Sequence, residues 1–409
     1  MKQGIHILLL MLAMMMASVM PLQAKEQYVD PIFGDTIDRT AEDFVTVSLL
    51  VADPGKAVYS TMGHSCLRMQ CPTFGLDYCF SYESEDVTTR FWSFIAGNLY
   101  MGLFAIPTAE YCNSYIPEGR GVYEYKLNLP ANVEQNLWRI LDEQVAKGSL
   151  LQYDYLKRGC TIACVEFLQK ALGEHKIRYD ASLYEQSPTG RDLVKRATTN
   201  SLWMRFFVCF IAGSECDKPL HGKKQLLVPA DLVDAWKKAT INGEPLMSSE
   251  PIVLVEGEPQ AKNGWFTPLI AMLLVLLLSI ANLFWDKPYF DWLMLATQTM
   301  IGVFMVYLIF ISDLCHTSWN WLIVPFNVLP ALAWYWRKWW SLAYACVLLV
   351  WCGVMAYVAI WGHVLVDWPH IVLVLAWVMV LVKQSTSQLR TIHALFTHNR
   401  RTINIELLY

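Results

Sequence analysis

The residue best suited to covalent chemistry is Cys160, which lies in the stretch Tyr153–Cys164. After Gly159 the apolar residues recur at helical spacing, and Gly173 is placed to end the helix, so Cys160 is predicted in the first turn. There the free backbone N–H groups and the helix dipole favour a thiolate over a thiol. Such a thiolate is a nucleophile that lies beside a site for an oxyanion. Cys164, one turn further on, is predicted to point into the helix packing and is the poorer candidate.

A nucleophilic thiol needs a base, and His64 is the best candidate. If residues 56–69 form a strand interrupted at Gly63, His64 and Arg68 share one of its faces. An imidazole beside a thiolate is the Cys–His arrangement that nucleophilic acyl transfer requires. The alternative is a histidine that is hydrogen-bonded at a strand edge. His175 and His221 compete for the role of base, but both lie in polar, loop-like surroundings.

A third group normally orients the imidazole, and the next predicted strand offers Tyr82 and Glu83, between which the sequence does not choose. Arg68 is interpreted either as a phosphate-binding residue or as a surface cation. Neither CxxC nor HxxxH spacing occurs, so no zinc site is expected.

The elements that position these residues follow from periodicity and from turn residues. An aromatic-rich segment at 90–101 is ambiguous and is interpreted as a short helix, and residues 203–211 are interpreted as packing in the core or dipping into the membrane surface. Strands followed by helices indicate an α+β domain. The predicted strands are 45–51, 56–69, 77–83 and 121–129, and the predicted helices begin at 133 and 160.

Composition divides the chain into an exported part and a membrane part. The 409 residues are 55% hydrophobic and 17% charged, which is too apolar for an ordinary soluble protein. The net charge of −4 and the lack of a basic stripe argue against a nucleic-acid partner. The predicted divisions are a signal peptide (1–24), a periplasmic catalytic domain (25–250), a linker (251–265), a transmembrane domain (266–382) and a cytoplasmic tail (383–409).

The transmembrane domain is predicted to hold five helices, each approaching the length of a bilayer core. Lysines and arginines gather in alternate loops, whereas the loops around His316 and 363–370 carry none. By the positive-inside rule, the N-terminal domain and these two loops lie on the outer side of the membrane. The five segments are 266–284, 290–312, 319–336, 340–362 and 366–382.

An exported protein can also form disulfides. The second interpretation of Cys160 is therefore that it is one cysteine of a disulfide, or a buried residue that only fills space in the core. Cys209 with Cys216, or pairs among Cys66, Cys71 and Cys79, are sensible partners. Spacing alone does not determine the connectivity.

Two spaced motifs resemble a known family. Gly-His-x-x-Leu-Arg (63–68) followed about a hundred residues later by Asp-Tyr-x-x-x-x-Cys-Thr (154–161) resembles the Lnb-type lipoprotein N-acyltransferases. His316, Asn320 and Asn327, before Pro330, are similar to the His-Asn-Asn-Pro pattern of that family's transmembrane domain. Two positions depart from the family, which commonly has Asn where this chain has Gly159 and a second Thr where it has Ile162.

The resemblance implies an α+β papain-like fold (circularly permuted, NlpC/P60-like) for the periplasmic domain, followed by the all-α membrane domain. It implies that Cys160 takes a fatty acyl chain from a membrane phospholipid as a thioester, with His64 as base. The acceptor is then the α-amino group of a diacylated lipoprotein, and neither a metal nor a nucleotide cofactor is needed. Substrate-binding roles are expected for Arg68, His316, Asn320 and Asn327.

Two other functions remain as alternatives. Relatives of NlpC/P60 cut peptidoglycan, so a cell-wall peptidase or amidase anchored in the inner membrane is one, although a polytopic anchor is more than such an enzyme needs. A non-enzymatic membrane sensor or scaffold, in which the exported domain binds a partner, is the other.

Overall fold

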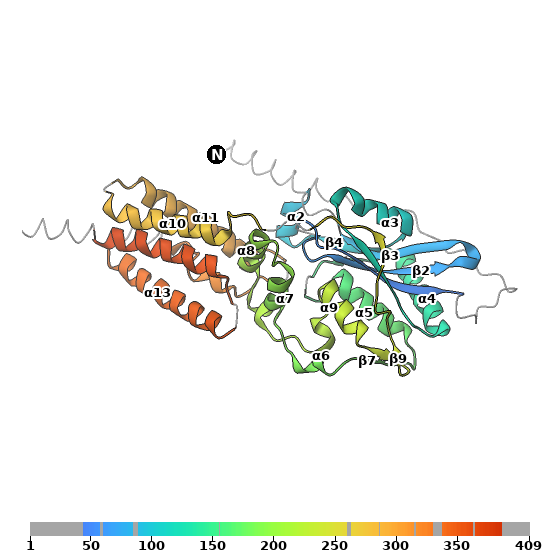
Figure 1. Ribbon diagram of the computed structural model, residues 1–409. Helices are drawn as coiled ribbons and strands as arrows, with labels where there is room; N and C mark the ends of the chain where they lie inside the picture. The colour runs from blue at the N-terminus through green and yellow to red at the C-terminus, as the bar shows by residue number, and fades with distance from the viewer. Residues whose placement is uncertain are drawn as a thin grey trace, which may run out of the picture.

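The structure is a computed structural model, and it shows an α/β domain beside a bundle of helices (Figure 1). The predicted signal peptide and the predicted tail beyond residue 386 lie outside the described residues. The described residues are 44–57, 60–84, 89–154, 156–259, 263–285, 287–314, 316–329, 338–362 and 365–386.

A seven-stranded antiparallel sheet forms the centre of the α/β domain, in the order β10-β5-β1-β2-β3-β4-β6. The strands predicted at 45–51, 77–83 and 121–129 are confirmed as β1, β3 and β5. The strands are β1 (Thr46–Ala52), β2 (His64–Cys71), β3 (Leu76–Ser84), β4 (Tyr100–Pro107), β5 (Val122–Lys126), β6 (Leu150–Gln152) and β10 (Ile252–Val255).

Two predicted boundaries are wrong. The strand predicted from residue 56 begins only at His64, because Gly63 has a positive φ of 84° that ends the preceding turn and redirects the chain. The predicted linker begins with a strand instead, since β10 pairs with β5 through Ile252 and Glu124 at the edge of the sheet. The interpretation of 90–101 is confirmed in part, because α2 (Phe91–Ala96) is a short helix but Tyr100 already starts β4.

Helices cover both faces of this sheet. The periodicity of two in β2 directs Leu67 and Met69 to the face covered by α4 (Ala131–Lys147), α5 (Cys160–Ala171) and α9 (Pro229–Lys237), where they are fully buried. Full burial of one such side chain stabilises the fold by roughly 1.5–3 kcal/mol. Cys66, the residue before Leu67, faces the other side of the sheet, which α3 (Thr108–Tyr115) covers.

Residues 177–250 add a small lobe to the domain. A three-stranded sheet, β7-β8-β9, lies beside short helices, of which α7 begins with a capping box made by Thr189 and Asp192. The elements are β7 (Ile177–Arg178), α6 (Ser182–Glu185), α7 (Gly190–Ala197), α8 (Leu202–Ile211), β8 (Thr240–Ile241) and β9 (Glu244–Pro245).

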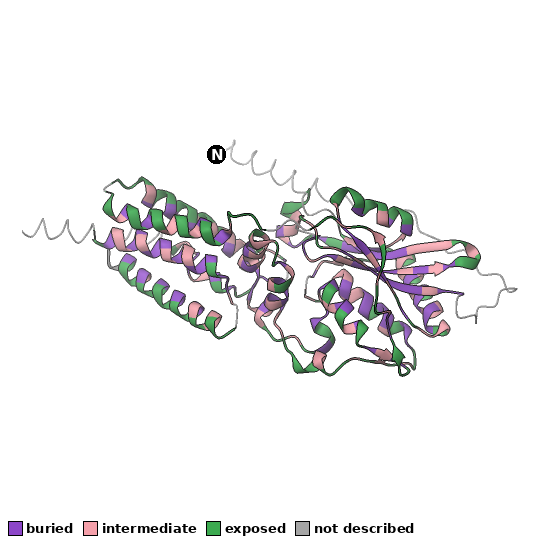
Figure 2. Ribbon diagram, viewed as in Figure 1, coloured by how far each residue is buried: buried purple, intermediate pink, exposed green. Residues whose placement is uncertain are grey.

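The C-terminal part is helical, and three of its described helices are long and apolar enough to cross a membrane. These are α11 (Tyr289–Phe310), the C-terminal part of α13 (Lys338–Ile360) and the helix Trp368–Thr386. The bundle turns many exposed residues outward (Figure 2), as a lipid-facing surface does.

The other two predicted spans are not confirmed. The first contains α10 (Pro268–Ala281), which with the turn that follows it reaches only Phe284 and is shorter than a usual span. In the segment 319–336, the described residues before Leu329 form turns, bends and the short 3-10 helix Trp321–Ile323, Leu329 is helical, and residues 330–336 lie outside the described part.

Candidate active site

Cys160 is the first residue of α5, as the sequence predicts. Gly159 precedes it in an extended conformation and accepts a hydrogen bond from the N–H of Ala163 at 3.0 Å, so the helix begins abruptly at the thiol. Thr161 and Cys164 turn inward and are buried, and this confirms that Cys164 points into the packing. Of the two cysteines in α5, Cys160 is therefore the one whose thiol lies at the helix start, where backbone N–H groups have no partner within the helix.

His64 starts β2 at the end of the sheet where α5 also begins. Burial alone would lower the pKa of His64, but the charge of the Cys160 thiolate and a hydrogen bond with it raise the pKa to about 9. Burial would likewise raise the pKa of Cys160, but the His64 charge, its hydrogen bond and the backbone N–H of Ser65 lower it to about 6. Between these pH values the two side chains form a thiolate–imidazolium pair.

A serine and a carboxylate hold the other side of the imidazole. Nε2 of His64 lies 2.7 Å from Oγ of Ser81, which donates to Glu83 Oε1 at 2.6 Å. Glu83 Oε1 is itself 3.7 Å from Nε2. Ser81 is a site residue that the sequence reasoning missed. Its signal is its position two residues before Glu83, which places both side chains on one face of β3.

Of the two proposed orienting residues, Glu83 lies beside His64 and Tyr82 does not. Tyr82 points to the opposite face of β3, where its ring stacks on Phe167 with centroids 6.0 Å apart. There it lines a cavity of about 10 Å³ together with Cys160. The alternation of β3 thus separates the two candidates.

Two pockets flank the Cys160–His64 pair, one on each face of the sheet. The pocket of about 270 Å³ on the α5 side combines apolar side chains with two cations and the carboxylate of Glu166. The pocket of about 250 Å³ on the α3 side holds three carboxylates and the cation Arg120 among its ten lining residues. The first is lined in part by Met101, Leu151, Arg158, Gly159, Phe167 and Lys170. The second is lined in part by His64, Glu83, Glu110, Tyr111, Glu118 and Arg120.

Arg68 lies on the same face of β2 as His64, but acidic residues occupy its guanidinium. It donates to both carboxylate oxygens of Asp77, at 2.8 and 2.6 Å, and to Glu124 at 2.8 Å. The hydrogen bond from Arg68, together with those from Thr108 and Gln70, holds the pKa of Asp77 below its ordinary value, although burial alone would raise it. The structure therefore shows Arg68 tying β2 to β3 and β5 rather than opening toward a substrate.

His316, from the segment after α11, contacts the α/β domain directly. Its Nε2 lies 2.6 Å from Asp154, and its Nδ1 lies 2.6 Å from Glu215. Asp154 also accepts hydrogen bonds from the N–H groups of Leu156 and Lys157 at 3.0 Å, in the turn that leads to Cys160. His316 is thus joined through one carboxylate to the segment that carries the nucleophile.

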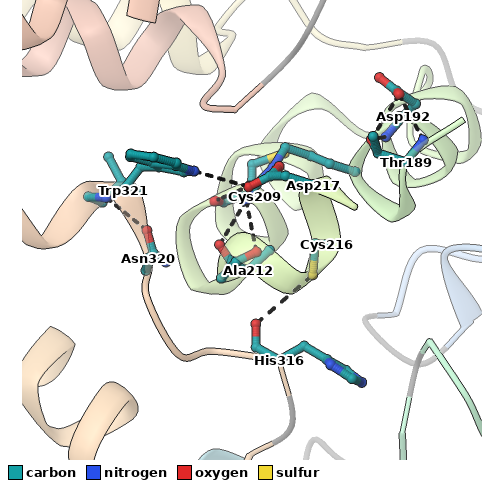
Figure 3. Close-up of polar contacts among 12 residues, drawn as sticks. Thr189, Asp192, Cys209, Ala212, Cys216, Asp217, His316, Asn320 and Trp321 are labelled. Carbon is teal, nitrogen blue, oxygen red and sulfur yellow. Dashed lines mark hydrogen bonds and ion pairs between the residues drawn. The ribbon is translucent and has the colours of Figure 1, made fainter. Parts of the chain in front are cut away.

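The docking of this segment continues on its other side (Figure 3). The carbonyl of His316 accepts from Gly213 N–H at 2.6 Å, and Trp321 donates to Asp217 at 3.2 Å. Asp217 in turn pairs with the buried Arg191, at 2.7 Å. A Cβ at Gly213 would lie 2.2 Å from the carbonyl oxygen of Ser318, so only glycine permits this approach.

Asn320 and Asn327 make hydrogen bonds inside the protein. Asn320 accepts from Leu322 N–H at 2.9 Å and donates to the carbonyl of Phe210 at 2.7 Å. Asn327 donates to the hydroxyl of Tyr344 at 2.8 Å. These bonds cap a short helix and join helices to one another, and they leave the expected substrate-binding roles as predictions.

The competing histidines are engaged elsewhere. His175, which is half-buried, lies 3.3 Å from Asn242, and the exposed His221 lies 2.7 Å from Ser187. Neither histidine is among the residues that line the two pockets beside Cys160 and His64.

The predicted disulfides are not formed. Cys66, Cys79 and Cys209 are free thiols, and each predicted pair contains one of them. Cys71 faces the side of the sheet opposite to Cys66 and Cys79, because it lies an odd number of positions after Cys66 on the same strand. Cys160 is also a free thiol, as a nucleophile must be.

Comparison with known proteins gives a family match over the part of the chain that carries these residues. No curated protein and no solved structure matches the chain. A family model, the Lnb N-terminal periplasmic domain, matches residues 36–196, which include both His64 and Cys160. Residues 36–196 of this chain are therefore a member of the Lnb periplasmic domain family.

Proposed function

We propose that this chain is a lipoprotein N-acyltransferase, which moves a fatty acyl chain from a membrane phospholipid to the α-amino group of a diacylglyceryl-cysteine. The observation that carries the proposal is the Cys160–His64 pair in an Lnb periplasmic domain, on a chain that also has membrane-capable helices. A thiolate with an adjacent imidazolium suits acyl transfer between two lipid substrates at neutral pH.

The first half-reaction forms a thioester. The Cys160 thiolate attacks the ester carbonyl of the phospholipid, and the C–O bond to the glycerol breaks. The imidazolium of His64 protonates the leaving alkoxide, so a neutral hydroxyl of a lysophospholipid departs. Since Ser81 and Glu83 hold the Nε2 side of the ring, we assign this proton transfer to Nδ1.

The second half-reaction forms the amide. His64, now neutral, accepts a proton from the α-amino group as its nitrogen attacks the thioester carbonyl. The C–S bond breaks and the Cys160 thiolate is restored beside the imidazolium. The energy of the phospholipid ester is carried through the thioester, so the chemistry requires no nucleotide.

The two pockets suit these two substrates. Apolar side chains with Arg158 and Lys170 fit an acyl chain and a phosphate, which favours the phospholipid on the α5 side. On the α3 side, Glu83 and Glu110 attract the α-amino group as an ammonium, and Arg120 pairs with Glu118 there. The ammonium releases one proton to water before its nitrogen attacks the thioester. Each substrate would then reach the thioester carbon from its own face of the sheet.

We extend the proposal to the fold and to the placement in the membrane. The histidine-bearing strand precedes the cysteine-bearing helix, as in a circularly permuted NlpC/P60-like, papain-like domain. Lys287 and Lys383 lie at one end of the bundle, where Lys383 donates to the carbonyl of Lys287 at 3.4 Å, and His316 lies toward the α/β domain. By the positive-inside rule this puts the lysine end in the cytoplasm of a bacterial inner membrane, with five crossings as the proposed number.

The test is the intact mass of a reporter lipoprotein from cells that lack N-acylation. The cells express the parent chain, Cys160→Ser or Cys164→Ser at matched membrane levels. The expected result is an added acyl mass on the N-terminal cysteine with the parent and with Cys164→Ser, and none with Cys160→Ser.

Two outcomes would contradict the proposal. Addition with Cys160→Ser would place the nucleophile elsewhere. No addition with the inserted parent would favour a cell-wall peptidase or a scaffold, which digestion of peptidoglycan by the same membranes would then separate.

A further inference from the structure

Two short helices that belong to the α/β domain by sequence take part in the core of the helix bundle. Ile95 of α2 is buried in the same hydrophobic cluster as residues of α11 and α13, and Phe210 and Ile211 of α8 pack against that cluster. Neither helix contributes to the core beneath the seven-stranded sheet. The bundle therefore extends beyond its own spans to include α2 and α8.

The outer end of α11 holds α2 in place. Ser312 Oγ donates to the carbonyl of Ile95 at 2.5 Å, and the N–H of Asp313 donates to the carbonyl of Ala96 at 3.0 Å. A Cβ at Gly97 would lie 2.1 Å from the backbone carbon of Asp313, so the two segments are in direct backbone contact. With Ile95 inward, α2 turns Trp92 outward, and 78% of that residue is exposed.

The starts of the neighbouring helices hold α8 in a similar way. Trp203 donates to the carbonyl of Phe266, just before α10, at 3.0 Å, and Phe206 stacks on His370 with ring centroids 4.3 Å apart. Arg205, the one charged residue within α8, pairs with Asp367. On the remaining face 57% of Phe207 is exposed.

Exposed aromatic residues gather at both ends of the bundle. At the end near the α/β domain they come from α2 and α8 as well as from the starts and ends of the spans, and at the other end they surround the turn between α10 and α11. The first group includes Phe91, Trp92, Trp203, Phe207, Trp265, Phe310 and Trp368, and the second includes Phe284, Trp285, Tyr289 and Trp292.

The separation of the two groups fits a bilayer. The 22 residues of α11 run from one group to the other, and at about 1.5 Å per residue they span roughly 33 Å. The hydrocarbon core of a membrane is about 30 Å thick, and aromatic residues concentrate at its two interfaces. Phe91, Trp92, Trp203 and Phe207 then lie at the level of the outer interface.

We propose that the exposed faces of α2 and α8 form a lipid-contact surface, which inserts into the headgroup and upper acyl-chain region of the outer leaflet. The partner is the phospholipid bilayer itself, because the surface is continuous with the membrane spans and its one charged side chain is paired inward. This surface lies beside the strand that leads to the α5-side pocket, since Gln152 at the end of β6 donates to the carbonyl of Gly97 at 2.7 Å and its neighbour Leu151 lines that pocket.

The experiment places p-benzoylphenylalanine, a photo-crosslinking amino acid, at single positions of the full-length chain in nanodiscs of phosphatidylethanolamine and phosphatidylglycerol. The positions are Trp92 and Phe207, with Met300 in the middle of α11 as the positive control and Thr73 at the far end of the sheet as the negative control. All four proteins carry Cys160→Ser, so lipid contact is read without acyl transfer and a failure of the proposed function would not affect the result.

After irradiation, intact mass should show lipid adducts at positions 92, 207 and 300 and none at 73. Adducts at 300 alone would overturn the proposal, and so would equal labelling at 73. A second measurement uses the chain with no photo-crosslinking residue and a phosphatidylethanolamine with a diazirine near its acyl ester. Peptides from α2 and α8 should be labelled, and their absence beside labelled peptides of α11 would contradict the insertion.

Discussion

Two histidines of this chain lie beside carboxylates, one at the candidate nucleophile and the other where the helix bundle meets the α/β domain. The side chain of His64 is 17% exposed, lines a pocket and faces the thiol of Cys160. The side chain of His316 is 3% exposed, and carboxylates lie 2.6 Å from both of its ring nitrogens. The ring of His64 therefore has an edge that can exchange a proton, whereas both nitrogens of the His316 ring are engaged by carboxylates.

The charge state of His316 follows from its partners. The hydrogen bond from His316 lowers the pKa of Glu215, and it also holds the pKa of Asp154 down although burial alone would raise it. Both groups are then carboxylates, which only accept hydrogen bonds, so both ring nitrogens carry protons. In this arrangement His316 joins two segments by donating from both ring nitrogens, whereas His64 alternates between two protonation states in the proposed reaction.

The largest effect should come from breaking the reactive pair. His64→Ala removes the base and the cation that stabilises the thiolate, and acyl transfer should fall by about 10²- to 10⁴-fold. The reporter lipoprotein assay in membranes measures this loss. His175→Ala, which changes a half-buried histidine away from the two pockets, is the matched control and should keep full activity.

The pH dependence of Cys160 alkylation gives the same comparison a direct readout. The pKa of Cys160 is lowered from 9.0 to about 6, so the thiolate forms as the pH rises through 6 and the rate of reaction with iodoacetamide should rise there. In His64→Ala the midpoint should move upward toward the ordinary value, because the stabilising cation is gone. A midpoint that stays near 6 would contradict the thiolate–imidazolium pair.

Breaking the buried His316–Asp154 pair should lower the stability of the protein and leave the reactivity of the Cys160 thiol unchanged. His316→Ala leaves Asp154 buried without its cation, and loss of one partner of a buried ion pair costs about 3–5 kcal/mol. Thermal unfolding of the full chain in nanodiscs measures the loss, and activity should fall with it. The midpoint of Cys160 alkylation should remain near 6, whereas a shift as large as in His64→Ala would assign His316 to the reaction.

A smaller effect is expected where the backbone of the two parts meets. Gly213→Ala places a Cβ 2.2 Å from Ser318 O, and such overpacking costs about 1–3 kcal/mol. Gly264→Ala is the control, because a Cβ there meets nothing within 4 Å. Equal melting temperatures for the two variants would argue against the close docking of the segment after α11.

The smallest effect concerns the orientation of His64. Ser81→Ala removes the hydroxyl that accepts a hydrogen bond from Nε2 of His64, and the loss of about 0.5–1.5 kcal/mol corresponds to a rate decrease of about 2- to 10-fold. The decrease should fall on kcat and leave KM for the phospholipid unchanged, since Ser81 touches His64 and not the substrate. Ser81→Thr keeps the hydroxyl and should restore part of the rate.

The sequence by itself determined the parts that depend on local pattern. The helix that begins at Cys160 follows from its apolar spacing and the glycine before it, and β1, β3 and β5 follow from alternation. Three membrane-capable helices follow from length and hydropathy alone. The motifs around His64 and Cys160 indicated the family that covers residues 36–196.

Only the tertiary structure decided which distant residues share a contact. The register between β2 and β3 places Ser81 and Glu83 beside His64, and the alternation of β3 directs Tyr82 to the other face of the sheet. Long-range packing pairs Arg68 with Asp77 and Glu124, joins His316 to Asp154, and buries α2 and α8 with the bundle. Periodicity reports which face of an element is apolar but not which element covers it, so these partners were set by the assembled fold.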